Sequence, residues 1–148
     1  MLRQDILVVV SFGVGEMIID KRGGEMEILT WKYVKTLKDP DVVNKFLRKY
    51  DIVLPQTLLD CIVQNNGGRP SKKDFITDKG REYVFKSLLS YNIEDAECIY
   101  DVYPSLFKAT SLYPIGTDAS GNFICYDWNT QKYVLLKHET NTIENIIL

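Results

Sequence analysis

The sequence predicts an α+β fold in which helices pack on a mostly antiparallel sheet. Apolar residues recur at helical spacing over residues 39–50 and 55–65, whereas aromatic and β-branched residues bounded by turn signals fill residues 115–139. The last stretch is typical of a β-meander, and a hairpin needs further strands or helices on its apolar face to be stable in water. With 148 residues, the chain is long enough for one domain that buries roughly 70% of its unfolded surface.

The first predicted helix begins at Asp39 and ends near Tyr50. Asp39 is a suitable N-cap, Pro40 suits the first helical position, and Asp41 complements the helix dipole. Upstream of this helix, we expect Trp31 to fill the edge of the core.

The second predicted helix is opened by Pro55 and stopped by the run from Asn65 to Gly68. Asn and Gly tolerate the left-handed backbone conformation of a helix C-cap. We therefore assign Asn66, Gly67 and Gly68 as structural turn and cap residues.

A basic stretch, residues 69–81, follows the second helix. It lacks the Gly-rich pattern that cradles phosphate groups, so we favour a solvated loop with one short strand near Phe75 and Ile76 over a phosphate-binding loop. Residues 83–90 are mainly aromatic and aliphatic, which predicts another strand.

A third helix is predicted to start at Asn92 as its N-cap, with Asp95 in a capping-box-like position. Pro104 should end or kink this helix. Its buried stripe is expected to comprise Ile99, Val102, Tyr103 and Leu106.

Four carboxylates are expected to face outward in the first turns of the third helix. Acidic residues there stabilise a helix through its macrodipole by roughly 0.3–1 kcal/mol each, which is the structural interpretation. The alternative is an acidic patch that contacts a partner. The four residues are Glu94, Asp95, Glu97 and Asp101.

Polar residues shape the turns of the meander. Gly121 and Asn122 end the loop before Phe123, and Asp118 in the preceding polar run is placed to cap backbone amides. Asp127 ends a strand before the next turn. A carboxylate pair or metal loop built on the two aspartates is the alternative, but the run lacks the repeated acidic ligands of an EF-hand.

Few residues form catalytic or metal-binding patterns. Cys61, Cys98 and Cys125 stand far apart without a CxxC pair, which indicates reduced, buried thiols. His138 is the only histidine, which argues strongly against a His/Cys zinc site. A nucleophilic pair of Cys125 and His138 has no evident orienting acid or oxyanion motif, so we favour a core thiol beside a strand-end histidine. We expect no catalytic residue, no metal and no cofactor.

The charge is distributed unevenly along the chain. The net charge is −2, with +3 on residues 1–90 and −5 on residues 91–148. Phosphate contacts need Lys and Arg, so the acidic second half argues against a nucleic-acid-binding face there. A basic protein partner suits this half better.

The N-terminal segment requires a separate interpretation. Residues 6–14 are apolar, but they cannot span a bilayer that takes roughly 20 residues, and they lack the basic flank of a secretory signal. The run Arg22–Met26 is what a purine-rich ribosome-binding site encodes when it is translated. We therefore expect residues 1–25 to be a translated leader and residues 26–148 to form one domain, the alternative being an extra edge strand. Detection of the peptide Gln4–Lys21 in the native protein by mass spectrometry would refute the leader.

Taken together and in this order, several short motifs resemble the SUKH superfamily, bacterial immunity proteins related to a yeast cell-wall assembly regulator. The resemblance covers about residues 31–147. The motifs are Leu54-Pro55 opening a helix that ends in Asn66-Gly67-Gly68, Pro114-Ile115-Gly116 with Asp118, Gly121-Asn122 before Phe123–Asp127, and His138-Glu139.

The resemblance implies a SUKH-like α+β fold and a cytoplasmic immunity protein that neutralises a cognate polymorphic toxin, in many cases a nuclease, by direct stoichiometric binding. It provides no catalytic residues. The alternative functions are a regulatory scaffold that binds cellular proteins and, ranked last, a hydrolase that uses Asp118 and Asp127. Neither nucleic acid nor a membrane is an expected partner. The acidic residues expected to face a basic toxin are Glu94, Asp95, Glu97, Asp101, Asp118 and Asp127.

The sequence departs from the family pattern in two further places. Pro104 interrupts the third predicted helix. The printed chain also stops at residues 143–148, where relatives continue into an amphipathic helix that covers the sheet. We expect an exposed apolar face as a result, which favours a partner, an oligomer or aggregation.

Overall fold

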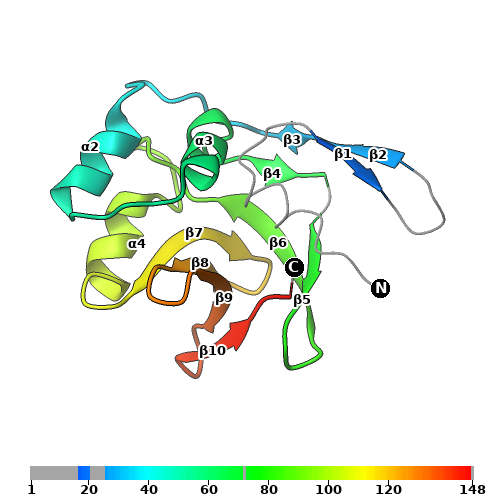
Figure 1. Ribbon diagram of the computed structural model, residues 1–148. Helices are drawn as coiled ribbons and strands as arrows, with labels where there is room; N and C mark the ends of the chain where they lie inside the picture. The colour runs from blue at the N-terminus through cyan, green and yellow to red at the C-terminus, as the bar shows by residue number, and fades with distance from the viewer. Residues whose placement is uncertain (1–16, 21–25, 72, 148) are drawn as a thin grey trace.

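The computed structural model describes residues 17–20, 26–71 and 73–147, and it shows an α+β fold with a C-terminal meander (Figure 1). Three helices lie on one side of a curled, mostly antiparallel sheet in the part of the chain described. The helices are α2 (Val42–Lys49), α3 (Gln56–Gln64) and α4 (Ile99–Leu106). The strands are β1 (Met17–Asp20), β2 (Met26–Leu29), β3 (Trp31–Lys32), β4 (Arg69–Pro70), β5 (Asp74–Ile76), β6 (Glu82–Leu88), β7 (Leu112–Asp118), β8 (Phe123–Asp127), β9 (Lys132–Lys137) and β10 (Thr142–Asn145).

The main sheet has six antiparallel strands in the order β10-β9-β8-β7-β6-β5. The predicted meander is confirmed, since β8 pairs with β9 from Phe123 opposite Leu136 to Asp127 opposite Lys132. Two smaller ribbons are formed by β1 with β2 and by β3 with β4. Within the main sheet, every neighbouring pair is joined by a short connection except β6 and β7, between which α4 is inserted, whereas α2 and α3 lie between the paired strands β3 and β4.

The two edge strands of the main sheet meet, so the curled sheet closes on itself. Thr77, directly after β5, forms an antiparallel bridge with Ile146, directly after β10. The backbone N–H of Ile147 donates to the carbonyl of Ile76 at 3.1 Å, and that of Asp78 donates to the carbonyl of Asn145 at 2.8 Å. Closure satisfies backbone groups that an open edge leaves for another chain to pair with.

A buried carboxylate holds this closure. Glu144 on β10 is 4% exposed and accepts hydrogen bonds from the hydroxyl of Thr77 at 2.6 Å and that of Tyr83 at 3.0 Å. The guanidinium of Arg81 donates to its other oxygen at 2.9 Å. Burial by itself raises the pKa of Glu144, but the hydrogen bonds from Thr77 and Tyr83 and the charge of Arg81 outweigh it and leave the pKa below its ordinary value.

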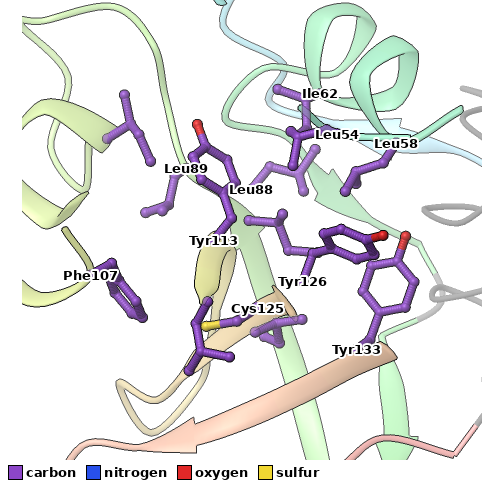
Figure 2. Packing of buried hydrophobic residues seen from close by; sticks show 14 of the residues in the cluster. Leu54, Leu58, Ile62, Leu88, Leu89, Phe107, Tyr113, Cys125, Tyr126 and Tyr133 are labelled. Carbon is purple, nitrogen blue, oxygen red and sulfur yellow. The ribbon is translucent and has the colours of Figure 1, made fainter. Parts of the chain in front are cut away.

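The core lies between the helices and the inner face of the sheet. Figure 2 shows Leu58 and Ile62 of α3 lying over the β-strand residues Tyr126 and Tyr133, with Tyr113 of β7 nearby. Every residue of β7 is buried, because the strand is central in the sheet and covered on one face by helices. Trp31, predicted to fill the core edge, packs against this cluster.

The first two helices follow the predicted pattern, with one correction. Helix α3 is confirmed, with Pro55 as N-cap and Asn65 as C-cap. Helix α2 ends where expected but begins at Val42 with Asp41 as N-cap, so the assignment of Asp39 as N-cap is wrong. The carboxylate of Asp39 instead accepts from the N–H of Asp41 in a turn that precedes the helix.

The predicted start of the third helix is wrong. Helix α4 begins at Ile99, with Cys98 as N-cap, and the stretch from Asn92 to Cys98 is a series of turns. The side chain of Asn92 is bound to a distant segment, where it donates to the carbonyl of Thr36 at 3.0 Å and accepts from the N–H of Lys38 at 3.1 Å. It therefore joins two loops and does not cap a helix.

The C-terminal half of this helix also differs from expectation. Pro104 does not end the helix, which continues to Leu106 and closes with the N–H of Phe107 donating to the carbonyl of Tyr103 at 2.9 Å. A proline here removes one hydrogen bond from an eight-residue helix. Leu106 was expected in the buried stripe but is 56% exposed, whereas Ile99 and Tyr103 are buried as predicted.

Only part of the N-terminal segment that was predicted to be a leader lies within the described residues. Residues 1–16 and 21–25, which carry most of the predicted leader, lie outside them. Residues 17–20 form β1, which pairs with β2 in a ribbon of its own and is not an edge strand of the main sheet. Within the described segments, no helix is long and apolar enough to cross a membrane.

We expect Glu144→Gln to lower the free energy of unfolding by about 1–3 kcal/mol, because an amide cannot replace a charged acceptor for Thr77, Tyr83 and Arg81. Chemical denaturation measures the change. Glu139→Gln, at an exposed position, is the matched control and should leave stability unchanged. Equal stability of both variants would contradict a role for Glu144 in closure.

The stabilising effect of Glu144 should also depend on pH. A carboxylate whose pKa is lowered on folding stabilises the protein above its unfolded pKa of about 4.3, and this contribution is lost as the pH falls through the folded pKa. The stability difference between the wild type and Glu144→Gln should therefore be largest near neutral pH and shrink in acid. A difference that stays constant into acid would show that the ionised form is not what holds β10.

Candidate partner-binding surface

Asp118 lies inside the protein as the centre of a turn. It is 1% exposed, and its carboxylate accepts from the backbone N–H of Ser120 at 3.0 Å and of Asn122 at 2.7 Å, and from the Asn122 side-chain amide at 2.9 Å. Gly121 within this turn has a φ of +86°, which favours glycine. With these donors already bound, Asp118 has little capacity left to contact a partner.

Asn122 links the turn to the end of β9. Its side-chain oxygen accepts from the backbone N–H of His138 at 3.1 Å and lies 2.9 Å from Nδ1 of the same imidazole. Asp127 lies at the other end of β8, is 9% exposed, and accepts from the N–H of Asn129 at 3.0 Å. The two aspartates are therefore separated by the length of a strand and do not form a carboxylate pair.

The cysteines are buried and poorly suited to nucleophilic chemistry. Cys125 on β8 lies opposite Val134 on β9, four positions before His138, so the two residues weighed as a nucleophilic pair are not opposite each other. Burial raises the pKa of the Cys125 thiol well above its ordinary value and that of Cys61 to about 12. Among the described residues there is also no cluster of His, Cys, Asp and Glu that suits a metal ion.

Asn66 connects three segments of the chain. Its side-chain amide donates to the carbonyl of Lys35 at 2.8 Å and to the Ser90 hydroxyl at 3.1 Å, and its side-chain oxygen accepts from the N–H of Tyr91 at 2.8 Å. Gly67 follows with a φ of +67°. A Cβ on Gly68 would lie 2.8 Å from the carbonyl oxygen of Asn65, closer than real Cβ contacts, so the chain can turn this tightly only with glycine.

The segment fixed by Asn66 carries the predicted acidic residues. Glu94 forms an ion pair with Lys38, and Glu97 pairs with Lys86 at 2.8 Å. These pairs neutralise part of the charge that the sequence places here. Because both pairs are solvent-exposed, they contribute little to stability and can exchange partners readily.

The other two acidic residues differ in their availability. Asp95 is half-buried and accepts from the hydroxyl of Ser90 at 2.6 Å, so it holds the segment in place. Asp101, in the first turn of α4, is exposed, and its carboxylate accepts a weak hydrogen bond from the Cys98 thiol at 3.3 Å. Glu94 and Asp101 are thus the carboxylates that a partner reaches at the lowest structural cost.

Apolar side chains and two neighbouring hollows accompany these charges. Ile93 is 73% exposed beside Glu94. A hollow of about 300 Å³ includes Ile93, Glu94 and Tyr100, and a second of about 320 Å³ shares Tyr100 and Val42 and extends along α2 to Tyr50. We call this region, which consists of segment 93–101 and the outer side of α2, the helical face. Hydrophobic residues surrounded by charges are the usual anatomy of a protein interface.

The sequence did not indicate the apolar part of the helical face. Ile93 was not singled out, because one isoleucine between polar residues shows no periodicity. Lys45 and Lys49 of α2 line the second hollow, so the region carries both signs of charge and is not uniformly acidic. Their position opposite α4 depends on tertiary packing that no local pattern reveals.

Comparison with known proteins provides one match. A family model described as SMI1 / KNR4 family (SUKH-1) matches residues 37–145. Neither a search of curated proteins nor a search of solved structures finds a match. The matched region runs from the loop before α2 to the end of β10 and therefore includes the helical face.

We expect Asn66→Ala to lower the free energy of unfolding by about 2–4 kcal/mol, because it leaves the buried N–H of Tyr91 and the carbonyl of Lys35 without their partners. Amide hydrogen exchange should also accelerate at Tyr91. Asn44→Ala, at an exposed position of α2, is the control and should have little effect. Unchanged exchange at Tyr91 would mean that Asn66 does not fix the acidic segment.

Proposed function

Because the chain belongs to the SMI1 / KNR4 family (SUKH-1), we propose that it is an immunity protein that neutralises a cognate polymorphic toxin by direct, stoichiometric binding. The family match over residues 37–145 is the observation that carries this proposal. The resemblance seen in the sequence motifs agrees with this family match. It implies that the protein acts in the cytoplasm, the compartment in which a nuclease toxin would meet its substrate.

The arrangement of polar groups supports binding better than catalysis. Asp118, Asp127 and His138 do not converge in a cleft, and Asp118 is occupied by backbone and amide donors. A catalytic acid or base needs free capacity and reach to a substrate. The hydrolase hypothesis, ranked last on the sequence, gains no support from this geometry.

The helical face is the surface that we assign to the toxin. Ile93 provides an exposed apolar contact next to hollows that a partner side chain can fill. Glu94 and Asp101 lie at its edge, and a basic toxin domain complements them. Such rim charges mainly accelerate association, whereas apolar contacts at the centre slow dissociation.

Co-expression with a toxin tests the proposed function. As candidate toxin we choose the C-terminal domain of the protein encoded immediately upstream, and we expect this protein to restore growth and to co-purify with that domain in a fixed ratio. Growth inhibition that persists despite soluble, folded protein would contradict the proposal. Binding to a cellular protein without protection would favour the alternative, a regulatory scaffold.

Charge reversal tests the assigned surface. We expect Glu94→Lys combined with Asp101→Lys to slow association with the toxin by about tenfold and to reduce its salt dependence, because rim charges steer the encounter. Stopped-flow or surface-plasmon measurements give the rate. Glu82→Lys with Glu139→Lys, at exposed positions at the start of β6 and after β9, changes the net charge equally outside the helical face and should have a much smaller effect. Equal slowing by both pairs would remove the helical face from the assignment.

A further inference from the structure

A further hollow of about 460 Å³, apart from the two on the helical face, lies between the β3–β4 ribbon and β6, and cations surround it. No aspartate or glutamate is among its lining residues in the part of the chain described. The residues that matter here are Lys32, Tyr33, Arg69, Lys73, Val84 and Lys86. We call this region the basic groove.

Most of the positive charge in the basic groove is unpaired. Lys86 forms an ion pair with Glu97 at 2.8 Å, but no described acidic residue pairs with Lys32, Arg69 or Lys73. Lys32 and Arg69 lie directly opposite each other in the β3–β4 ribbon. Like charges in that arrangement destabilise a ribbon, so the fold itself gains nothing from this pair.

Tyr33 adds an exposed ring beside the cations. It is 73% exposed, and the guanidinium of Arg69 lies 5.7 Å from its ring centroid. Its φ of +59° is an unfavourable backbone conformation for tyrosine. Val84, 38% exposed, continues the apolar floor of the groove.

We propose that the basic groove binds an acidic segment of a partner protein. Carboxylates of that segment pair with Lys32 and Arg69, and one of its apolar or aromatic side chains lies against Tyr33 and Val84. The ligand relieves the repulsion between the two opposed cations, and Arg69 is already oriented by its contact with the tyrosine ring.

Charge and extent favour an acidic polypeptide over a nucleic acid. Nucleic-acid-binding domains are strongly basic and carry a long stripe of cations, whereas this chain has a net charge of −2 and a pI near 5.4. The basic groove also ends at the Lys86–Glu97 pair. A short acidic segment meets the local charge without placing a long polyanion along the acidic remainder of the protein.

The basic groove is separate from the helical face assigned to the toxin, so this proposal goes beyond the proposed function. The two regions meet only at Glu97, which belongs to segment 93–101 and pairs with Lys86. The protein is therefore able to hold a toxin on one surface and an acidic segment on another.

The test uses the full chain and three labelled probes: a short peptide of Glu-Glu-Phe-Ser repeats, the same peptide with Gln for Glu, and an oligothymidylate of equal length. We expect the acidic peptide to bind and to shift the amide resonances of Lys32, Tyr33 and Arg69, and the Gln peptide not to bind. Lys32→Gln with Arg69→Gln should weaken binding by about tenfold, because it removes both cations that pair with the segment. The control, Arg48→Gln with Lys108→Gln, removes the same charges at exposed sites elsewhere and should change binding by less than about twofold, the size expected for screened distant charges.

Several results would overturn the proposal. Resonance shifts that fall outside the basic groove, equal binding of the Gln peptide, or equal weakening by the control pair would each show that only diffuse charge is involved. Tighter binding of the oligothymidylate would assign the groove to nucleic acid instead. Concentration-dependent self-association abolished by Lys32→Gln with Arg69→Gln would identify a second copy of this chain as the occupant.

Discussion

The closure of the curled sheet depends on one buried carboxylate. Glu144 connects the last strand to Thr77, Arg81 and Tyr83, which lie more than sixty positions earlier in the chain. The backbone bonds between Ile147 and Ile76 and between Asp78 and Asn145 join the same two edges, but Glu144 is the group that brings a charge into the closure. Because a buried charge is stable only when it is fully paired, the ionised carboxylate both requires and enforces this one register. The closed sheet in turn gives the three helices a fixed surface to pack on.

Local chemistry made much of this fold predictable. Pro55 and the Asn-Gly stop after Asn65 define α3 through backbone conformation alone, and alternating turn and strand residues define the meander. The start of α4 was not predictable in this way. Asn92 has the side chain of an N-cap, but Thr36 and Lys38, far away in sequence, bind it more favourably. The contact by which Glu144 closes the sheet could not be predicted from the sequence either, because its partners are distant in sequence and only the complete fold brings them near.

The candidate surface was predictable only in outline. Counting charges located an acidic segment, but Glu94 and Glu97 carry less free charge than the count suggests, because Lys38 and Lys86 pair with them. Asp118 is of a residue type that usually lies on the surface, but here it is buried and caps backbone N–H groups of a turn. Whether a carboxylate is available to a partner depends on its neighbours in space. Composition therefore indicates the sign of a surface, whereas burial and pairing decide which residues compose it.

Buried polar groups that are hydrogen-bonded within the protein distinguish the scaffold from the outer surfaces, where some of the described apolar and charged groups lack partners. Inside, Asn66 and Asp118 meet nearly all of their hydrogen-bonding capacity within the protein, so they specify shape and leave no capacity for chemistry. Outside, the features with a folding cost are Ile93 exposed to water, Tyr33 in a left-handed conformation and cations opposed across the β3–β4 ribbon. Folding does not require these features. A bound macromolecule can remove the cost of the exposed isoleucine and of the opposed cations, whereas the backbone strain at Tyr33 remains. Among the described residues, the buried side-chain polar atoms are satisfied within the protein except the indole nitrogen of Trp31, and the exposed apolar and cationic groups are the ones that another macromolecule can contact.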